Sequence, residues 1–363
     1  MKIVIFGLTV SSSWGNGHAT LWRGLIRALA RSGHEVTFFE RDVPYYAANR
    51  DLNAIPNGEL VLYAGWEDVS ARANAEITEA DVGIVTSYCP DGRAATDLVL
   101  DAPSAARVFY DLDTPVTLSR LARGEAIDYL GPQGLEGFDL VLSYTGGRAL
   151  EQLRTRLGAR QVAPLYGHVD PSVHRPVAPA ERFRADLSYI GTYAADRQAA
   201  LEALFIDPAR QRPAQRFLIA GSQYPAAFPW TQNIFFVHHL PPDDHAAFFS
   251  SGRLTLNVTR QSMAEMGWCP SGRLFEAAAC GAAILSDSWE GLDTFFIPGE
   301  EILTAADQGG ALAALDLSDA EIARIARAGR ERVLAEHTSD HRAGEFERLL
   351  DAARQTTLSL QDA

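Results

Sequence analysis

The sequence predicts an α/β protein with two Rossmann-like domains, each a doubly wound parallel sheet, that face each other across a cleft. Three observations carry this prediction. Residues 2–40 read as strand, small-residue loop, helix and strand, which is a βαβ unit. Further apolar runs of strand length alternate with helical stretches, which is typical of parallel sheets covered on both faces. A chain of 363 residues that is 47% hydrophobic can fill two cores.

The first domain is expected at 1–165 and the second at 181–363, with a linker at 166–180 where prolines are frequent and helix formers few. Strands are expected in the first domain at 2–6, 35–40, 60–64, 82–86, 107–110 and 140–143, and in the second at 187–190, 216–220, 234–237, 254–258 and 283–286. Helices at 319–336 and 341–353 are expected to close the second domain or to return to the first.

The composition excludes several classes of function. The net charge of 32 − 46 = −14 disfavours nucleic acid and anionic membranes as partners. Lys2 is the only lysine, which excludes a lysine Schiff base and a P-loop lysine. Three scattered cysteines (Cys89, Cys269, Cys280) form neither a zinc pair nor a disulfide framework. With no signal-peptide pattern and no apolar run of about 20 residues, we expect a cytoplasmic protein without a membrane span.

The segment 260–281 is the richest in chemistry. Arg260 follows an expected strand, and Ser271 is expected to cap a helix that Gly281 ends. Ser271, Gly272 and the free N–H groups of the first turn predict an anion site, to which Arg273 adds a forked cation. Glu276 lies one turn deeper on the face of Gly272, where its carboxylate could accept bonds from both hydroxyls of a ribose.

These residues carry a family resemblance. The segments "SGRLFEAAACGAAILSD" and "EGLDTFFIPGEEIL" resemble the nucleotide-sugar signature of glycosyltransferases with the GT-B fold, including family 4. Together with "YDLDTP", "SYTGG", "LYGHVDP" and "YIGTYAADR" they resemble the spore-maturation (CgeB-like) glycosyltransferase group over about positions 1–305. The resemblance implies the GT-B fold, a nucleotide diphospho-sugar donor in the second domain and a ribose contact for Glu276.

One departure from family 4 is informative. That family pairs two glutamates eight positions apart, and the position eight before Glu276 is Trp268. The resemblance therefore supports the ribose contact but not a copy of the glutamate that touches the sugar, and inversion or retention stays open. Because this half of the chain has no lysine, Arg260 and Arg273 have to serve the diphosphate, and arginine suits bidentate phosphate contacts.

Acceptor-side chemistry is expected in the first domain. The loop before the first helix contains Gly15, Gly17 and His18, and a histidine there could act as general base or merely cap and pack. Asp111 and Asp113 follow a strand, and a metal site between them is disfavoured because a helix-terminal phosphate site needs no metal. Asp113 is expected to be a base, an acceptor contact or a turn residue. Thr145 and Gly146 follow another strand and permit close approach of an acceptor.

Other loops after strands of the second domain complete the expected donor site. They contribute Gly191, Thr192, Tyr193, Arg197, Gly221, Ser222, His239 and Leu240. Tyr193 could stack on a base or sugar, or pack in the core. His168 and His174, in the linker, are expected to be structural.

The sequence thus predicts a metal-independent, cofactor-free glycosyltransferase that acts on an unknown acceptor. A nucleotide-sugar epimerase of the same fold and a non-catalytic sugar-binding protein are the alternatives. The nucleobase, the sugar and the oligomeric state stay open.

Overall fold

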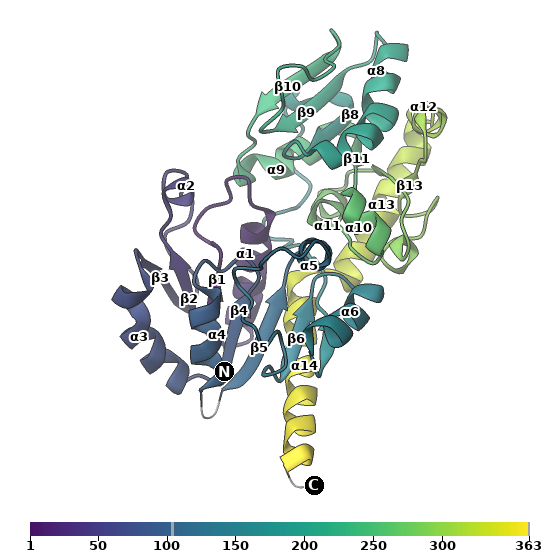
Figure 1. Ribbon diagram of the computed structural model, residues 1–363. Helices are drawn as coiled ribbons and strands as arrows, with labels where there is room; N and C mark the ends of the chain where they lie inside the picture. Colours follow the sequence, from purple (N-terminus) through teal and green to yellow (C-terminus); the bar gives the residue numbers. More distant parts are fainter. Residues whose placement is uncertain (103–104, 362–363) are drawn as a thin grey trace. The chain divides into compact units, whose positions relative to one another are not determined.

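The computed structural model describes residues 1–102 and 105–361 and divides the chain into two compact units (Figure 1). Unit 1 contains residues 1–166 and the C-terminal segment that begins at Ser339, and unit 2 is Gly167–Thr338. Among the described residues, none of the helices combines the length and the apolar run that crossing a bilayer requires.

Unit 1 is a parallel sheet of seven strands in the order β3-β2-β1-β4-β5-β6-β7. The strands are β1 (Lys2–Gly7), β2 (Glu35–Arg41), β3 (Gly58–Tyr63), β4 (Val82–Thr86), β5 (Ala106–Asp111), β6 (Leu140–Ser143) and β7 (Val162–Pro164). The helices are α1 (Gly17–Arg31), α2 (Pro44–Ala47), α3 (Trp66–Thr78), α4 (Gly92–Leu100), α5 (Thr114–Ala122), α6 (Arg148–Leu157) and α14 (Ser339–Gln361). Strand order reverses between β1 and β4, so the loops after these strands diverge there and leave room for a ligand.

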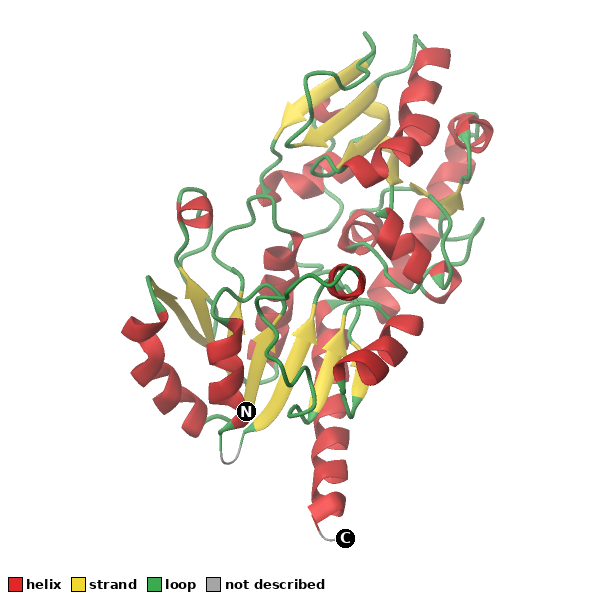
Figure 2. Ribbon diagram, viewed as in Figure 1, coloured by secondary structure: helices red, strands yellow, loops and turns green. Residues whose placement is uncertain are grey.

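The unbroken apolar runs of β1 and its neighbours follow from burial on both faces of this sheet. Ile3 and Ile5 belong to one core cluster, with residues of α1 and α14, whereas Val4 and Phe6 belong to a second, with residues of α3, α4 and α6. Figure 2 shows the helices packed against the strands. Each cluster is a continuous hydrophobic layer between sheet and helices.

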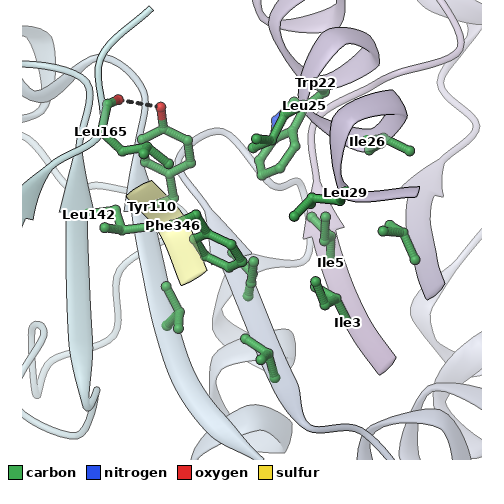
Figure 3. Packing of buried hydrophobic residues seen from close by; sticks show 14 of the residues in the cluster. Ile3, Ile5, Trp22, Leu25, Ile26, Leu29, Tyr110, Leu142, Leu165 and Phe346 are labelled. Carbon is green, nitrogen blue, oxygen red and sulfur yellow. Dashed lines mark hydrogen bonds between the residues drawn. The ribbon is translucent and has the colours of Figure 1, made fainter. Parts of the chain in front are cut away.

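Helix α14 completes the first of these clusters, far from the rest of the unit in sequence. Figure 3 shows Phe346 of α14 among Leu25, Tyr110 and Leu142, and the Tyr110 hydroxyl donates to the carbonyl of Leu165 over 2.7 Å. Burying a side chain such as Phe346 contributes about 1.5–3 kcal/mol. The C-terminal helix is therefore part of the unit 1 core.

Unit 2 is a parallel sheet of six strands in the order β10-β9-β8-β11-β12-β13. The strands are β8 (Ala185–Ile190), β9 (Phe217–Gly221), β10 (Ile234–His238), β11 (Gly252–Asn257), β12 (Ile284–Ser286) and β13 (Leu303–Thr304). The helices are α7 (Gln198–Leu201), α8 (Asp207–Gln211), α9 (Pro242–Phe249), α10 (Gln261–Met266), α11 (Gly272–Ala279), α12 (Gln308–Leu315) and α13 (Asp319–Glu336), with shorter turns η1 (Glu181–Phe183), η2 (Ala195–Arg197), η3 (Glu202–Ile206) and η4 (Leu292–Thr294).

Two short strands, β7 and β13, were not expected from the sequence, and both lie at the edge of a sheet. Pro164 ends β7, and an edge strand tolerates proline because its outer side needs no ladder hydrogen bond. Strands of two or three residues are too short to show an apolar pattern of their own.

Candidate functional site

Three arginines gather at the carboxyl ends of the central strands of unit 2. Arg273, in the first turn of α11, donates from Nη1 to Oδ1 of Asn257 at 2.9 Å, and its guanidinium lies over the ring of Tyr189 at 5.1 Å from the centroid. Arg260 donates from Nε to Asp196 over 3.1 Å, and Arg197 donates to the carbonyl of Thr192 over 3.3 Å. The sequence assigned Arg260 and Arg273 to a diphosphate and Arg197 to a donor-contacting loop, and in the structure the charge of Arg197 acts on Arg273.

Two of these guanidinium groups are under-satisfied. The Nε atoms of Arg197 and Arg273 are buried and find no hydrogen-bond partner among the residues that the structure describes. Burial lowers the pKa of Arg273, and the charge of Arg197 acts in the same direction. An anion that accepted hydrogen bonds here would satisfy the donors and offset the repulsion, because a phosphate oxygen is a strong acceptor.

The start of α11 is the second part of this site, and one detail differs from the sequence prediction. Ser271 occupies the N-cap position, but its side chain makes no capping hydrogen bond. Its hydroxyl is therefore not committed to the helix. Gly281 has a φ of +77° and follows the C-cap residue Cys280, as the prediction of the helix end requires.

Glycines allow the two nearest loops to approach. A Cβ at Gly191 would lie 3.1 Å from Nη2 of Arg273, and one at Gly221 would collide with the carbonyl of Gly191. Ser222 is buried, and its carbonyl accepts from the N–H of Tyr193 over 2.9 Å. These close contacts between the loops after β8 and β9 explain the small residues found there.

Tyr193 packs within an aromatic cluster. Its ring centroid lies 5.6 Å from that of Tyr224 and 6.3 Å from that of Phe228, and the Tyr224 hydroxyl donates to the Gly191 carbonyl over 3.1 Å. After β10, the N–H of His239 donates to the carbonyl of Gly221, and Leu240 is buried. Both neighbouring loops are thus tied to the end of β9.

Glu276 lies on α11 one turn after Gly272, and burial raises the pKa of its carboxyl. Two ionisable imidazoles lie near it: Nε2 of His174 is 4.0 Å from Oε1, and Nδ1 of His245 is 4.0 Å from Oε2. These distances exceed a hydrogen bond, so the carboxylate keeps acceptor capacity. His245 was missed in the sequence, where nothing around "PPDDHAAFF" marks it.

The position of the missing family-4 glutamate holds an indole. Trp268 has a φ of +43°, its backbone N–H donates to the Glu290 carbonyl over 2.7 Å, and its indole ring fills the space beside Gly291. The side chain is therefore engaged in packing.

In unit 1 the structure brings His18 and Asp113 together. The side chain of Asn16 caps α1 by accepting from the N–H of His18 over 3.0 Å, and Nε2 of His18 lies 3.5 Å from Oδ2 of Asp113. Each side chain is 20% exposed, so a ligand can reach them. Tyr88, after β4, places its ring 5.9 Å from the imidazole, and burial, followed by the charge of Asp113, raises its pKa.

Asp111 lies beneath this pair and is fully buried. One oxygen accepts from the N–H of Asp113 and from the Thr117 hydroxyl, each at 3.1 Å, and Oδ2 finds no partner among the described residues. Burial raises the pKa of Asp111 to about 6. The two aspartates therefore play different parts: Asp111 supports the turn, and Asp113 faces His18.

The loop that leads to His18 is anchored by Glu40, which was missed in the sequence. This buried carboxylate at the end of β2 accepts from the Thr9 and Ser11 hydroxyls and from the N–H groups of Val10 and Ser11. The loop then turns at Gly15, where φ is +60°, and α1 begins at Gly17. The sequence feature that could have identified Glu40 is a glutamate within an otherwise apolar strand.

The other acceptor-side residues lie in a tight turn after β6. Thr145 is fully buried, its N–H donates to the Ser143 hydroxyl over 3.1 Å, and that hydroxyl donates to the Thr145 carbonyl over 2.7 Å. Gly146 follows, two residues before α6 begins at Arg148. Within the described part of the chain, the side chains grouped closely enough to hold a metal ion are His174, His245 and Glu276 rather than the two aspartates.

Comparisons with known proteins bear on the fold and on the family of part of the chain. Residues 197–348 match a family model described as glycosyl transferase-like. No curated protein matches the sequence.

Solved structures of similar fold cover nearly the whole chain. Sucrose-phosphate synthase from Thermosynechococcus elongatus is 18% identical, with a TM-score of 0.68 over 97% of this chain and 100% of that one. An alpha-glucosyltransferase in complex with UDP is 14% identical, with a TM-score of 0.70 over the same shares. Anabaena HepE in complex with UDP-glucose is 14% identical, with a TM-score of 0.67, again over 97% and 100%.

These likenesses confirm the predicted fold class: the two parallel-sheet, Rossmann-like units match those of GT-B glycosyltransferases. The finer resemblance to the CgeB-like group and to family 4 stays a prediction.

Proposed function

We propose that this protein is a glycosyltransferase that moves a sugar from a UDP-sugar to an acceptor, without a divalent metal at the diphosphate. The observation that carries the proposal is the under-satisfied pair of buried guanidinium groups, Arg197 and Arg273, beside the first turn of α11. UDP is chosen because an alpha-glucosyltransferase and HepE, both of this fold, were solved with UDP or UDP-glucose. The acceptor is not specified by these groups.

In this proposal, unit 2 stabilises the leaving group. When the bond between the sugar and the diphosphate breaks, negative charge grows on the phosphate oxygens. Arg197, Arg260 and Arg273, with the N–H groups at the start of α11, offer the positive charge that a metal supplies elsewhere. Glu276 would accept hydrogen bonds from the ribose hydroxyls, which fits the unfilled acceptor capacity of its carboxylate.

Unit 1 would supply the base. The acceptor hydroxyl loses its proton as its oxygen bonds to the sugar, and the pair His18 and Asp113 would take it. Because Oδ2 of Asp113 lies 3.5 Å from Nε2 of His18, a proton gained by one is stabilised by the other. His18 and Asp113 would thus work as a pair. We also keep the cytoplasm as the proposed compartment, on the ground of the scattered cysteines.

The proposal is tested by thermal unfolding with UDP, GDP, dTDP, ADP and CDP in the presence of EDTA. UDP should raise the melting temperature most, with about 2.7 kcal/mol of stabilisation at 100 times its dissociation constant. A shift that vanished in EDTA and returned with Mn²⁺ would contradict the metal-free diphosphate site. Incubation with a UDP-sugar alone separates the alternatives, since an epimerase returns an altered sugar and a binding protein returns the donor unchanged.

A further inference from the structure

Three side chains from distant parts of the sequence meet inside unit 2. His174 lies in the segment before η1 and is 2% exposed, His245 lies on α9, and Glu276 lies on α11. The side chains of His245 and Glu276 are 15% and 17% exposed. The cluster is therefore largely buried but can be reached from solvent through its two partly exposed members.

The distances within the cluster suit a small ion better than direct hydrogen bonds. One ligand atom from each residue lies within 4.8 Å of the others, and each carboxylate oxygen of Glu276 faces a different imidazole at 4.0 Å. In a tetrahedral zinc site with bonds of 2.0–2.1 Å, neighbouring ligand atoms are about 3.4 Å apart. Closing the gap to that spacing takes side-chain movements of about 0.6 Å at the two 4.0 Å separations and at most about 1.4 Å within the 4.8 Å limit.

The backbone around the cluster holds the three groups in place. The N–H of His174 donates to the Asp170 carbonyl over 2.9 Å, and Asp170 also accepts from the N–H and hydroxyl of Ser172. Helix α9 is anchored by the buried Phe248 and Phe249, and α11 by its own apolar face. Ligands carried on packed elements give a metal site its required precision.

The electrostatics agree with the geometry. Burial is the largest effect on both ionisable partners, since it raises the pKa of Glu276 and lowers that of His245. The neutral imidazole is the form that binds metals, and a divalent cation supplies the positive charge that the carboxylate lacks.

We propose that His174, His245 and Glu276 form a binding site for a transition-metal dication, with Zn²⁺ as the best match. Two imidazoles and one carboxylate suit zinc, whereas Ca²⁺ and Mg²⁺ take oxygen ligands. Three protein ligands leave a fourth position open to water or a hydroxyl. The metal site does not depend on the proposed function. It is separate from the proposed diphosphate site, where we expect no metal.

Because Glu276 belongs both to the metal site and to the proposed donor site, a bound metal should affect donor binding. If Glu276 also accepts the ribose hydroxyls, Zn²⁺ and UDP compete for one carboxylate. Zinc should then inhibit the enzyme by raising the dissociation constant of UDP.

The test is a titration of the chelator-treated full-length protein with Zn²⁺, and with Co²⁺, whose visible absorption reports nitrogen and oxygen ligands. We expect one metal ion per chain. The affinity should fall at least about tenfold in His245→Ala, His174→Ala and Glu276→Gln. His341→Ala, an exposed histidine of α14, is the matched control and should bind as the wild type does.

Because His174 is buried, its replacement can destabilise the fold. The thermal unfolding of each variant is therefore recorded without metal, and His245→Asn serves as a second, milder substitution. Stoichiometric binding that survives both His245 variants, or no binding by the wild type, overturns the proposal. UDP affinity in EDTA tests the proposed function separately. Zinc that binds at these residues without affecting UDP leaves the metal site standing and contradicts the ribose contact of Glu276.

Discussion

The two units carry similar parallel sheets, but the charged residues of their candidate sites differ in sign. In unit 1 these ends hold Glu40, Asp111 and Asp113. In unit 2 the corresponding loops hold Arg197, Arg260 and Arg273. One architecture thus presents His18 and Asp113 in one unit and three arginines in the other, because the loops carry these side chains and the strands position the loops.

The two units also differ in how they satisfy buried charge. Four donors from residues 9–11 surround the carboxylate of Glu40, and this fixes the loop before His18. Arg273 has one hydrogen bond, to Asn257, and a stacked ring, with Nε left without a partner in the described part of the chain. The carboxylate of Glu40 is therefore satisfied within unit 1, whereas an anion bound in unit 2 would satisfy the remaining donor of Arg273.

The largest effect is expected from the acid–base pair. His18→Ala and Asp113→Ala should each lower the transfer rate about 10²- to 10⁴-fold, because a general base contributes that much. The dissociation constant of UDP should not change. The double variant should be little slower than the worse single variant, since the two groups act as a unit.

The rate is measured as UDP release from the UDP-sugar with an acceptor found by screening, and His341→Ala is the control. Normal turnover in both single variants would show that the base lies elsewhere.

A smaller effect, on binding alone, is expected in unit 2. Glu276→Ala should weaken UDP binding by about 1.5–3 kcal/mol, the range for hydrogen bonds to a charged group. Calorimetry in EDTA measures the change, and Glu331→Ala on α13, an exposed glutamate, should leave affinity unaltered. An unchanged dissociation constant for the Glu276 variant would remove the carboxylate from the donor site.

The smallest effect concerns the stability of unit 1. Burial raises the pKa of Asp111 to about 6, so its contribution to stability is fully present below the unfolded value near 3.8 and is lost as pH rises through about 6. Asp111→Asn removes this titration. The wild type should therefore gain about 1.4 kcal/mol relative to the variant when the pH falls from about 7.5 to about 5.

Urea unfolding at the two pH values measures this difference. Asp97→Asn, at an exposed position of α4, should show no such pH dependence. Equal pH profiles for wild type and Asp111→Asn would mean that the carboxyl is ionised throughout this range.

The sequence by itself determined the central strands and several key positions. Strands at 82–86 and 140–143 were predicted with the bounds that the structure has, because a strand buried on both faces is a continuous apolar run. Helix α11 was placed between Ser271 and Gly281, and Glu276 was placed one turn from its start. These features depend on patterns within about ten residues, which local propensity and burial encode directly.

Only the tertiary structure decided which distant groups meet. The sequence left the last helix able to close either domain, and packing of Phe346 and Leu350 into the unit 1 core decided the outcome. Asn257 beside Arg273, Glu40 beneath residues 9–11, and His174 and His245 around Glu276 have no signature in sequence spacing. Such contacts depend on strand order and on the rotation of each helix about its axis, which the packing of the whole core sets.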